Sequence, residues 1–450
     1  MLYLLYQHHQ YRGYRVQPKK HLSFSSLIKI FSQRVLQIKD TRQEGKVSHE
    51  IHDCCLSGLA MMFFQDPSML EFQTRLQKLI NINNLKMMFG VNSIPKSTQL
   101  RDVIDIISPQ SFDPIFSDFF RALQRDKQLE KFQVLNGMYL VPIDGTQYFS
   151  SGTISCPSCL IKNHANGTTT YSHQVICAAI VHPDRRQVIP LAPEPIQNMD
   201  GQIKQDCERN AGKRLLKKIR ETHPRLKIII AGDDLYANYP FIDELKINGM
   251  SFILVAKPGD HTFLFECLSK LKQQDKINTL EFNGTKGRRH IYEWVNGIPL
   301  NESRQADNIN YLEYTIIADD KVAFRCSWVT DIPVERGNIE TLVKGGRARW
   351  KIENENFNTL KNQGYHAEHN FGHGNQHASL NFFLFTLLAF FMHQILELTD
   401  PLFQKCRSEF SSRKEYWNQL RCTNRVLVFR NFEALLRFII SPPEEAMPPP

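Results

Sequence analysis

The 450-residue sequence lacks the features that mark a membrane or secreted protein. Its longest mainly apolar run, Phe382–Met392, is too short to span a bilayer, so we expect a buried helix there. No signal-peptide pattern opens the chain, because the apolar run Leu2–Tyr6 is short and is followed directly by His8, His9 and Arg12. We therefore expect a cytoplasmic protein without a membrane-spanning segment.

Cysteines are few, internal repeats are absent, and neither sign of charge dominates. The ten cysteines are scattered, which argues against a disulfide framework and indicates core residues or metal ligands in a reducing compartment. A charged content of 22% and a hydrophobic content of 42% are typical of a globular protein. The net charge of +9 is compatible with a polyanionic partner but does not require one.

The most informative stretch runs from Gly346 to Gly374. Its first half has no proline or glycine between Arg347 and Gln363, which predicts one helix that ends at Gly364. On a helical wheel, Arg349 and Glu353 lie one turn apart, on the side of the apolar residues Trp350, Phe357 and Leu360. Glu355 points the opposite way, as a solvated residue would. A carboxylate on the packed side is costly unless something binds it, although an ordinary ion pair of Arg349 with Glu353 would also explain the pattern.

Ahead of this stretch the sequence alternates between strands and helices. Four apolar strands are expected, at Tyr139–Ile143, Val175–Val181, Lys227–Ala231 and Phe252–Ala256, with a polar helix from about 202 to 220. This order indicates an α/β fold with at least one parallel pair. Asp144 and Asp233 follow the first and third strands, where functional carboxylates of such sheets lie. A single aspartate in that place is more commonly a turn or cap residue.

The remaining segments predict a division of the chain into parts. Short helices between Ile51 and Glu130, with lysines and arginines near their turns, suit either a DNA-binding bundle or an all-helical interaction domain. Four strands without a helix between 280 and 332 suggest a β-rich insertion. We divide the chain into a basic segment (1–50), a helical, DNA-binding domain (51–135), the first part of an α/β core (136–275), the insertion (276–335), the completion of the core (336–400), and C-terminal helices with an unstructured proline-rich tail from Pro442 (401–450).

Three local patterns together resemble a known family. Asp144 lies in V-P-I-D-G-T, Asp233 lies in A-G-D-D-L-Y-A, and Glu353 ends R-A-R-W-K-I-E. From about Ile51 to Leu398 the sequence resembles the DDE transposases of bacterial insertion sequences, specifically the group with the YREK signature. We choose Asp233 over the adjacent aspartate because it stands three residues before Tyr236, as the resemblance requires.

Two positions depart from that signature. Its tyrosine, three residues before the arginine, falls at Gly346, and its lysine, seven residues after the glutamate, falls at Leu360. Lys361 follows one place later. These departures concern the lysine that would assist the carboxylates, and they leave the three carboxylates in place.

The resemblance implies a fold, a chemistry and partners. The fold would be an RNase H-like core interrupted by a β insertion, with N-terminal and C-terminal helices. Asp144, Asp233 and Glu353 would hold two Mg²⁺ ions, with Mn²⁺ as a substitute, and Asp144 would be shared by both ions. Hydrolysis would release a 3′-OH, which would then attack target DNA. Arg349, Lys361 and Tyr236 would contact the DNA.

The implied partners are double-stranded DNA, at the terminal repeats of the element and at the target, and a second copy of the chain. Such a homodimer would work in the cytoplasm on the bacterial nucleoid. Two alternatives stay open, an RNase H-like nuclease that cuts without joining and an inactive relic that only binds DNA.

Two smaller patterns concern metals and charge. Cys156-Pro-Ser-Cys159 is followed by His164 and His173, which together could bind a structural zinc ion or could be free thiols beside ordinary histidines. Histidines also recur every four residues at 369, 373 and 377, but glycines at 372 and 374 would break a helix there, so we expect a loop. Asp206 and Glu208 are expected to be solvated.

Overall fold

The structure is a computed structural model that describes residues 21–43, 45, 47–76, 79–198, 206–285 and 287–442, without the side chains of 75–83. Three predictions fall partly outside this range. They are the first twenty residues of the basic segment, the start of the polar helix predicted from 202, and the tail from 443 onward.

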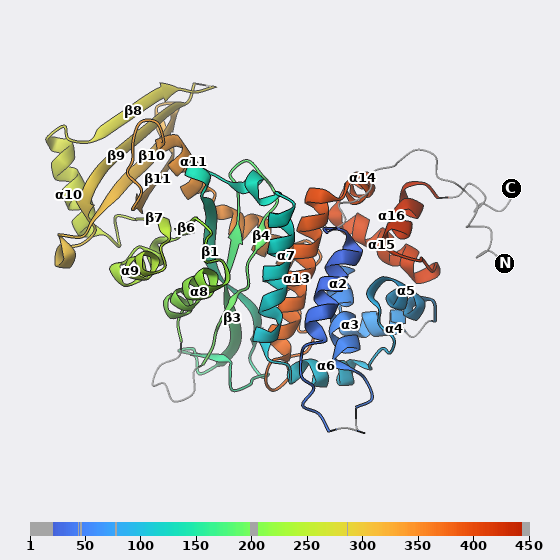
Figure 1. Ribbon diagram of the computed structural model, residues 1–450. Helices are drawn as coiled ribbons and strands as arrows, with labels where there is room; N and C mark the ends of the chain where they lie inside the picture. The colour runs from blue at the N-terminus through green and yellow to red at the C-terminus, as the bar shows by residue number, and fades with distance from the viewer. Residues whose placement is uncertain are drawn as a thin grey trace.

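Within the described residues, eleven strands form one mixed sheet with the order β2-β3-β1-β6-β7-β11-β10-β9-β8, while β4 and β5 pair with β3. Figure 1 shows the sheet running from the insertion at one end to the helical part at the other. The strands are β1 (Tyr139–Ser151), β2 (Leu160–Asn163), β3 (Thr169–Ile180), β4 (Ile189–Pro190), β5 (Glu194–Ile196), β6 (Ile228–Gly232), β7 (Ser251–Val255), β8 (Asn278–Asn283), β9 (Arg289–Pro299), β10 (Asn308–Ala318) and β11 (Lys321–Thr330).

The centre of the sheet is parallel and the rest is antiparallel. β6 pairs in parallel with β1 on one side and with β7 on the other, and β1 pairs antiparallel with β3. β6 is buried along its whole length, as expected for a strand that helices cover on both faces. The polar helix α8 (Glu208–Thr222) packs beside α9 (Tyr239–Ile247) over this region. The α/β fold class predicted from the sequence is confirmed.

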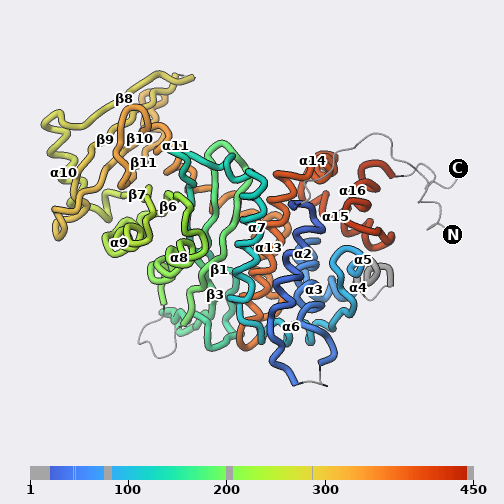
Figure 2. The backbone as a smooth tube through the Cα atoms, viewed as in Figure 1, coloured from blue at the N-terminus to red at the C-terminus, as the bar shows by residue number. Residues whose placement is uncertain are grey.

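The helical part is organised around α13 (Ala378–Thr399). Nearly all of its residues are buried, since helices from both ends of the chain surround it (Figures 1 and 2). The helices of this part are α2 (Phe24–Val35), α3 (Ile51–Phe63), α4 (Met69–Leu76), α5 (Leu79–Phe89), α6 (Ser97–Asp105), α7 (Asp113–Arg125), α14 (Pro401–Ser408), α15 (Arg413–Val426) and α16 (Phe432–Ile440), with short 3₁₀ turns at Pro109–Phe112 (η1), Leu129–Phe132 (η2) and Leu135–Gly137 (η3).

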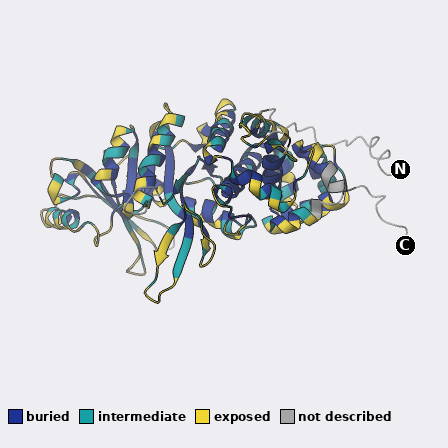
Figure 3. Ribbon diagram, turned by 90° about the horizontal axis from the view of Figure 1, so that it is seen from below, coloured by how far each residue is buried: buried dark blue, intermediate teal, exposed yellow. Residues whose placement is uncertain are grey.

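This arrangement bears on two expectations. Among the described residues, α13 is the one helix that is long and apolar enough to cross a membrane, but 89% of its apolar window is buried inside the protein. The run Phe382–Met392 therefore belongs to a core helix, as predicted. The N-terminal helices do not stand apart as a separate bundle, because α2, α3 and α6 pack directly on α13. Figure 3 shows the buried residues gathered inside the helices and along the sheet, with exposed residues on the outer faces.

The β-rich insertion continues the central sheet and does not form a separate body. β11 pairs antiparallel with β7 over Trp328–Thr330, and β10, β9 and β8 follow outward from it. Helix α10 (Thr262–Gln273) precedes these strands, and the 3₁₀ turn η5 (Glu302–Arg304) lies among them. The insertion is therefore fixed to the core by backbone hydrogen bonds.

The single helix predicted over 347–363 is wrong in detail. Helix α11 (Ile339–Arg347) ends where that helix was expected to begin, and a π-helix, η6 (Ile352–Phe357), leads into α12 (Asn358–Asn362). A wheel drawn at 100° per residue does not hold across a π-helical turn. Trp350, expected on the packed side, is consequently 54% exposed.

Candidate active site

The two aspartates lie beside each other at the same edge of the parallel sheet. The last paired residues of β1 and β6 are Pro142 and Ala231, and Asp144 and Asp233 each come two residues later. β1 does not end at Asp144, as expected, but continues to Ser151 along β3. Asp144 is thus held inside a strand at the point where β6 ends, while Asp233 caps the following 3₁₀ turn, η4 (Asp234–Tyr236), by accepting a hydrogen bond from Leu235 N.

Glu353 reaches the same region from the π-helix, which packs against β1 and β3. Nη1 of Arg349 lies 2.8 Å from Oε1 of Glu353 and 3.4 Å from Oδ2 of Asp144. The Arg349 side chain is 9% exposed and its guanidinium lies over the Trp350 ring at 4.7 Å. Arg349 therefore places one buried positive charge between two of the three predicted carboxylates.

Negative charge nevertheless accumulates around Asp144. Burial, opposed by the positive charge of Arg349 and reinforced by the carboxylates of Glu353, Glu208 and Asp233, raises the pKa of Asp144 to about 7. A carboxyl group with such a pKa takes up a proton or a cation at neutral pH. This crowding of acids is typical of functional sites.

Glu208 is a fourth acid of this site, which sequence reasoning missed. It begins α8, and its Oε1 accepts a hydrogen bond of 2.8 Å from the hydroxyl of Tyr236. A Cβ atom at Gly145 would lie only 2.7 Å from Glu208 Oε2, so the carboxylate packs directly against the backbone next to Asp144. The signal in the sequence was the glycine after Asp144, which leaves room for this approach.

Tyr236 is not a DNA contact in this structure. It was expected to touch DNA, but it is fully buried and uses its hydroxyl to hold Glu208. A side chain with no exposed surface cannot meet a phosphate. Tyr236 is therefore better described as a residue that positions a site carboxylate.

The neighbouring aspartate has other partners. Oδ1 of Asp234 accepts a hydrogen bond from Lys257 N at 2.9 Å, and burial together with Asp260 raises the pKa of Asp234 to about 6. Asp233, by contrast, contributes to the charge felt by Asp144. The choice of Asp233 over Asp234 stays a prediction, which these different partners favour.

The carboxylates surround one region, but they do not meet at one point. Within the described part of the chain, only a cysteine and histidine group brings three or more candidate ligand atoms close enough to share an ion. The two Mg²⁺ ions that the resemblance implies would require the three carboxylates to converge within a few ångströms of one position. Arg349 stands in the way, since its guanidinium occupies the space between Asp144 and Glu353.

The two departures from the YREK signature have physical explanations. A Cβ atom at Gly346 would lie 2.6 Å from the indole of Trp328, so this indole fills the space that a tyrosine would need. Leu360 is buried, which suits an apolar residue better than a lysine. Lys361 is partly exposed and pairs with Glu368 at 2.8 Å. Its positive charge slightly opposes the burial that raises the pKa of Cys177, the β3 residue paired with Asp144.

A basic groove opens beside the site. It has a volume of about 560 Å³ and lies between the middle of β11 and the C-terminal end of α11. Its positively charged lining residues are Arg325, Lys344, Arg347 and Lys351, and the exposed ring of Trp350 adds an aromatic face. Positive side chains can bind the phosphates of a nucleic acid, and an exposed aromatic ring can stack on an unpaired base.

The predicted zinc ligands are only partly brought together. Cys156, Cys159 and His173 lie close to one another, and the fourth member of the group is His373. His164 lies outside it, because its Nε2 atom is hydrogen bonded to Thr170 Oγ1 at 2.8 Å. His373 lies in a loop, as expected, but its side chain is buried.

Comparison with known proteins identifies the family. A family model of the transposase DDE domain matches residues 162–391, half of the chain, and this range includes Asp233 and Glu353 but begins after Asp144. A search of curated proteins gave no match to this sequence. The order of the central strands, with β1 flanked by antiparallel β3 and parallel β6, is consistent with the RNase H-like fold expected of such a domain. The chain therefore belongs to the transposases with a DDE domain.

Proposed function

We propose that this transposase cleaves DNA at the ends of an insertion sequence and joins the released 3′-OH to target DNA, with Asp144, Asp233 and Glu353 as its catalytic carboxylates. The observation that supports this proposal is the position of the three acids. Two follow the last paired residues of neighbouring parallel strands, and the third is linked to the first through Arg349.

The donor set fits a hard divalent cation. All the candidate ligands are carboxylate oxygens, which Mg²⁺ and Mn²⁺ prefer. Burial and, to a smaller extent, the neighbouring carboxylates raise the pKa of Asp144, and a bound cation would stabilise its ionised form. We propose that Asp144, Asp233 and Glu353 hold two Mg²⁺ ions, which would supply an activated nucleophile and stabilise charge on the phosphate oxygens.

The chain's own residues would divide the remaining tasks. Asp144, with its pKa near neutrality, has to release its proton before it can act as a ligand. Arg349 is held between the carboxylates by two ion pairs, and it would have to leave this space when the ions bind, which would free its charge for a neighbouring phosphate. Lys361 is positioned on the same side by Glu368 and would contact a phosphate from there.

The basic groove supports double-stranded DNA as the partner. Lys344 and Arg347 are exposed on its wall, and each phosphate that they neutralise would add salt-dependent affinity without sequence preference. Two element ends have to be brought together for transposition, so we propose a homodimer on DNA. The setting would be the cytoplasm of a bacterium, at its nucleoid.

Single replacement of Asp144, Asp233 or Glu353 by alanine tests this function. We expect each variant to lose Mg²⁺-dependent cleavage of element-end DNA and to bind that DNA about as well as the wild type, because affinity comes from lysines and arginines. A gel-shift and a cleavage assay on the same duplex provide the two readouts.

Glu355→Ala is the matched control. Glu355 lies two residues from Glu353 on the same π-helix, but its carboxylate is directed to Arg186 at 3.7 Å. This variant should cleave like the wild type. Full activity of Glu353→Ala would refute the assignment, and cleavage by the wild type without any joined product would identify a nuclease that does not transfer strands.

A further inference from the structure

We propose that Cys156, Cys159, His173 and His373 bind a single zinc ion, which fastens the β2–β3 region of the sheet to the loop ahead of α13. Their four ligand atoms all lie within 4.8 Å of one another. Cys156 and Cys159 lie in the turn before β2, His173 lies in β3, and His373 comes 200 residues after His173. This site is separate from the carboxylates of the proposed function and does not depend on them.

Five of the six distances between the ligand atoms are close to those of a tetrahedral zinc site, and all six are within 4.8 Å. Zn–S bonds of about 2.3 Å and Zn–N bonds of about 2.0–2.1 Å place two sulfurs about 3.8 Å apart, a sulfur and a nitrogen about 3.5 Å apart, and two nitrogens about 3.4 Å apart. The two Sγ atoms are 3.8 Å apart. Nε2 of His173 lies 3.5 Å from Cys156 Sγ and 3.4 Å from Cys159 Sγ.

The fourth ligand completes the same geometry. Nε2 of His373 lies 3.5 Å from Cys159 Sγ and 3.1 Å from Nε2 of His173. Both imidazoles thus direct the same type of nitrogen to one centre. The sulfurs are too far apart for a disulfide, whose S–S bond is about 2.05 Å.

Hydrogen bonding and burial favour metal binding by these side chains. Nδ1 of His373 lies 2.8 Å from the carbonyl oxygen of Gly374, and only a protonated Nδ1 can donate to it. The lone pair is then on Nε2, the atom that faces the cysteines, and such an outer hydrogen bond is the usual support of a zinc-bound histidine. Cys159, His173 and His373 are buried, so the ion would be shielded from solvent.

The flanking glycines explain how His373 reaches this place. A Cβ atom at Gly372 would lie 2.8 Å from Cγ of Arg101, so only glycine allows the loop to approach α6 this closely. Gly374 has a φ of +66°, a conformation that favours glycine. Directly after it, the Asp105 carboxylate accepts hydrogen bonds from the backbone amides of residues 375–378, which fixes the start of α13.

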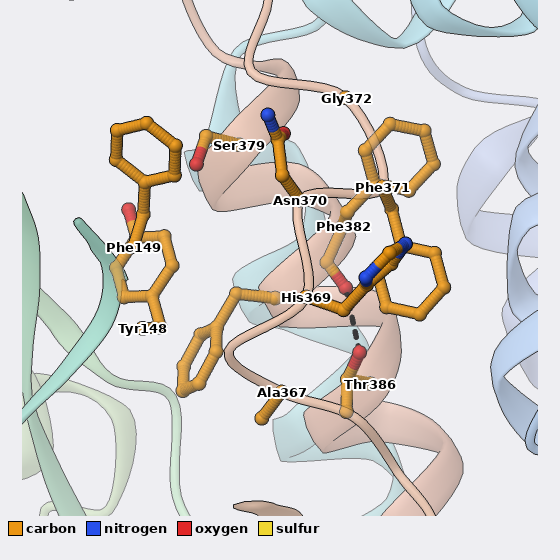
Figure 4. Close-up of a pocket in the computed structure, with 11 residues that line it drawn as sticks. Tyr148, Phe149, Ala367, His369, Asn370, Phe371, Gly372, Ser379, Phe382 and Thr386 are labelled. Atoms are coloured by element: carbon orange, nitrogen blue, oxygen red, sulfur yellow. Dashed lines mark hydrogen bonds between the residues drawn. The ribbon is translucent and has the colours of Figure 1, made fainter. Parts of the chain in front are cut away.

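The loop that carries His373 is packed between the sheet and α13. Figure 4 shows that this loop, Tyr148 and Phe149 of β1, and Ser379, Phe382 and Thr386 of α13 line a common pocket. The pocket between them has a volume of about 10 Å³, which is room for about one water molecule. With four protein ligands the ion would have no open position, so its role would be structural.

Metal analysis of the full-length protein tests the site. Protein purified without chelator should contain about one zinc per chain. After replacement of zinc by Co²⁺, the visible spectrum should show the strong d–d bands of a tetrahedral site together with sulfur-to-cobalt charge transfer. A strong chelator should lower the melting temperature of the wild type by at least about 5 °C.

Two histidine variants give a matched comparison. His373→Ala should lose the zinc and the response to chelator, whereas His164→Ala should keep both. If His373→Ala does not fold, His373→Cys retains a ligand and should bind Co²⁺ with increased charge-transfer absorption. Wild-type protein that contains no zinc and takes up neither Zn²⁺ nor Co²⁺ under reducing conditions would overturn the proposal, as would loss of zinc from His164→Ala alone.

Discussion

The buried hydroxyl of Tyr236 donates a hydrogen bond of 2.8 Å to Oε1 of Glu208. The two residues belong to different elements, the 3₁₀ turn after β6 and the first turn of α8. The bond orients the carboxylate of Glu208, which packs at Gly145 and raises the pKa of the neighbouring Asp144. Through this bond, the hydroxyl of Tyr236 holds in place a negative charge that raises the pKa of Asp144.

Replacing this tyrosine by phenylalanine should reduce cleavage without preventing folding. Tyr236→Phe leaves the shape of the buried ring but removes the donor to Glu208, and a hydrogen bond to a charged group contributes about 1.5–3 kcal/mol. We expect the rate of DNA cleavage to fall by about 10- to 100-fold, while DNA affinity in a gel-shift stays unchanged.

Tyr365→Phe is the control for this change. Tyr365 is also buried, and its hydroxyl is hydrogen bonded at 2.6 Å to His393 of α13, which is not one of the proposed site residues. Its loss should affect stability but not the cleavage rate of the folded protein. Wild-type cleavage by Tyr236→Phe would show that Glu208 does not need this donor.

Gly346→Ala should destabilise the protein. The new Cβ would lie 2.6 Å from the indole of Trp328, which is itself buried in β11 and cannot move without disturbing the sheet. Overpacking of this kind typically costs about 1–3 kcal/mol, measurable as a shift of the urea midpoint. Gly345→Ala is the matched control, because its Cβ would meet the flexible end of Ile253 at 3.2 Å. Equal stability of the two variants would contradict the packing argument.

Stability should fall in mild acid because of His223. This residue follows α8 and packs against the Phe120 ring at a centroid distance of 4.2 Å. Burial, with smaller effects of Arg121 and Arg220, lowers the pKa of His223 from 6.5 to about 4. Between these values the unfolded chain binds more protons than the folded one, so the free energy of unfolding decreases as the pH falls through this window.

The contribution of this histidine can be isolated by substitution. His223→Gln removes the titrating group, so denaturation between about pH 7 and pH 4 should show a smaller loss of stability than in the wild type. Each unit of pKa shift corresponds to about 1.4 kcal/mol, which sets the scale of the difference. Identical pH profiles would mean that other groups dominate the acid response.

Much of the fold could be predicted because the signals are local. The continuous apolar runs at β6 and β7 specify buried parallel strands, and the run in α13 specifies a core helix. The parallel pairing of β1 with β6 places Asp144 and Asp233 at equivalent positions, two residues after the last pair, and therefore at the same edge of the sheet. The π-helix at Glu353 was missed, because no glycine or proline marks it.

The parts of the two sites that were missed depend on partners distant in the chain. Glu208 has the local appearance of a solvated helix residue, and only its contact with Gly145 and Tyr236 shows otherwise. His373 contacts His173, which lies 200 residues earlier in the chain, whereas His164 was predicted because it is close to the cysteines in sequence. Periodicity and spacing carry no information about such long-range contacts.

The pairing of β11 with β7 determines how the outer strands of the insertion can change in length during evolution. The chain leaves the core after β7, passes through the outer strands, and returns on β11 directly beside the strand that it left. Glu353 follows that return strand and α11 in the chain, whereas the hairpin of β8 and β9 lies at the outer end of the sheet. The outer hairpin can therefore be lengthened, shortened or exchanged over evolutionary time as an appendage for new contacts, while the register of the carboxylates is preserved.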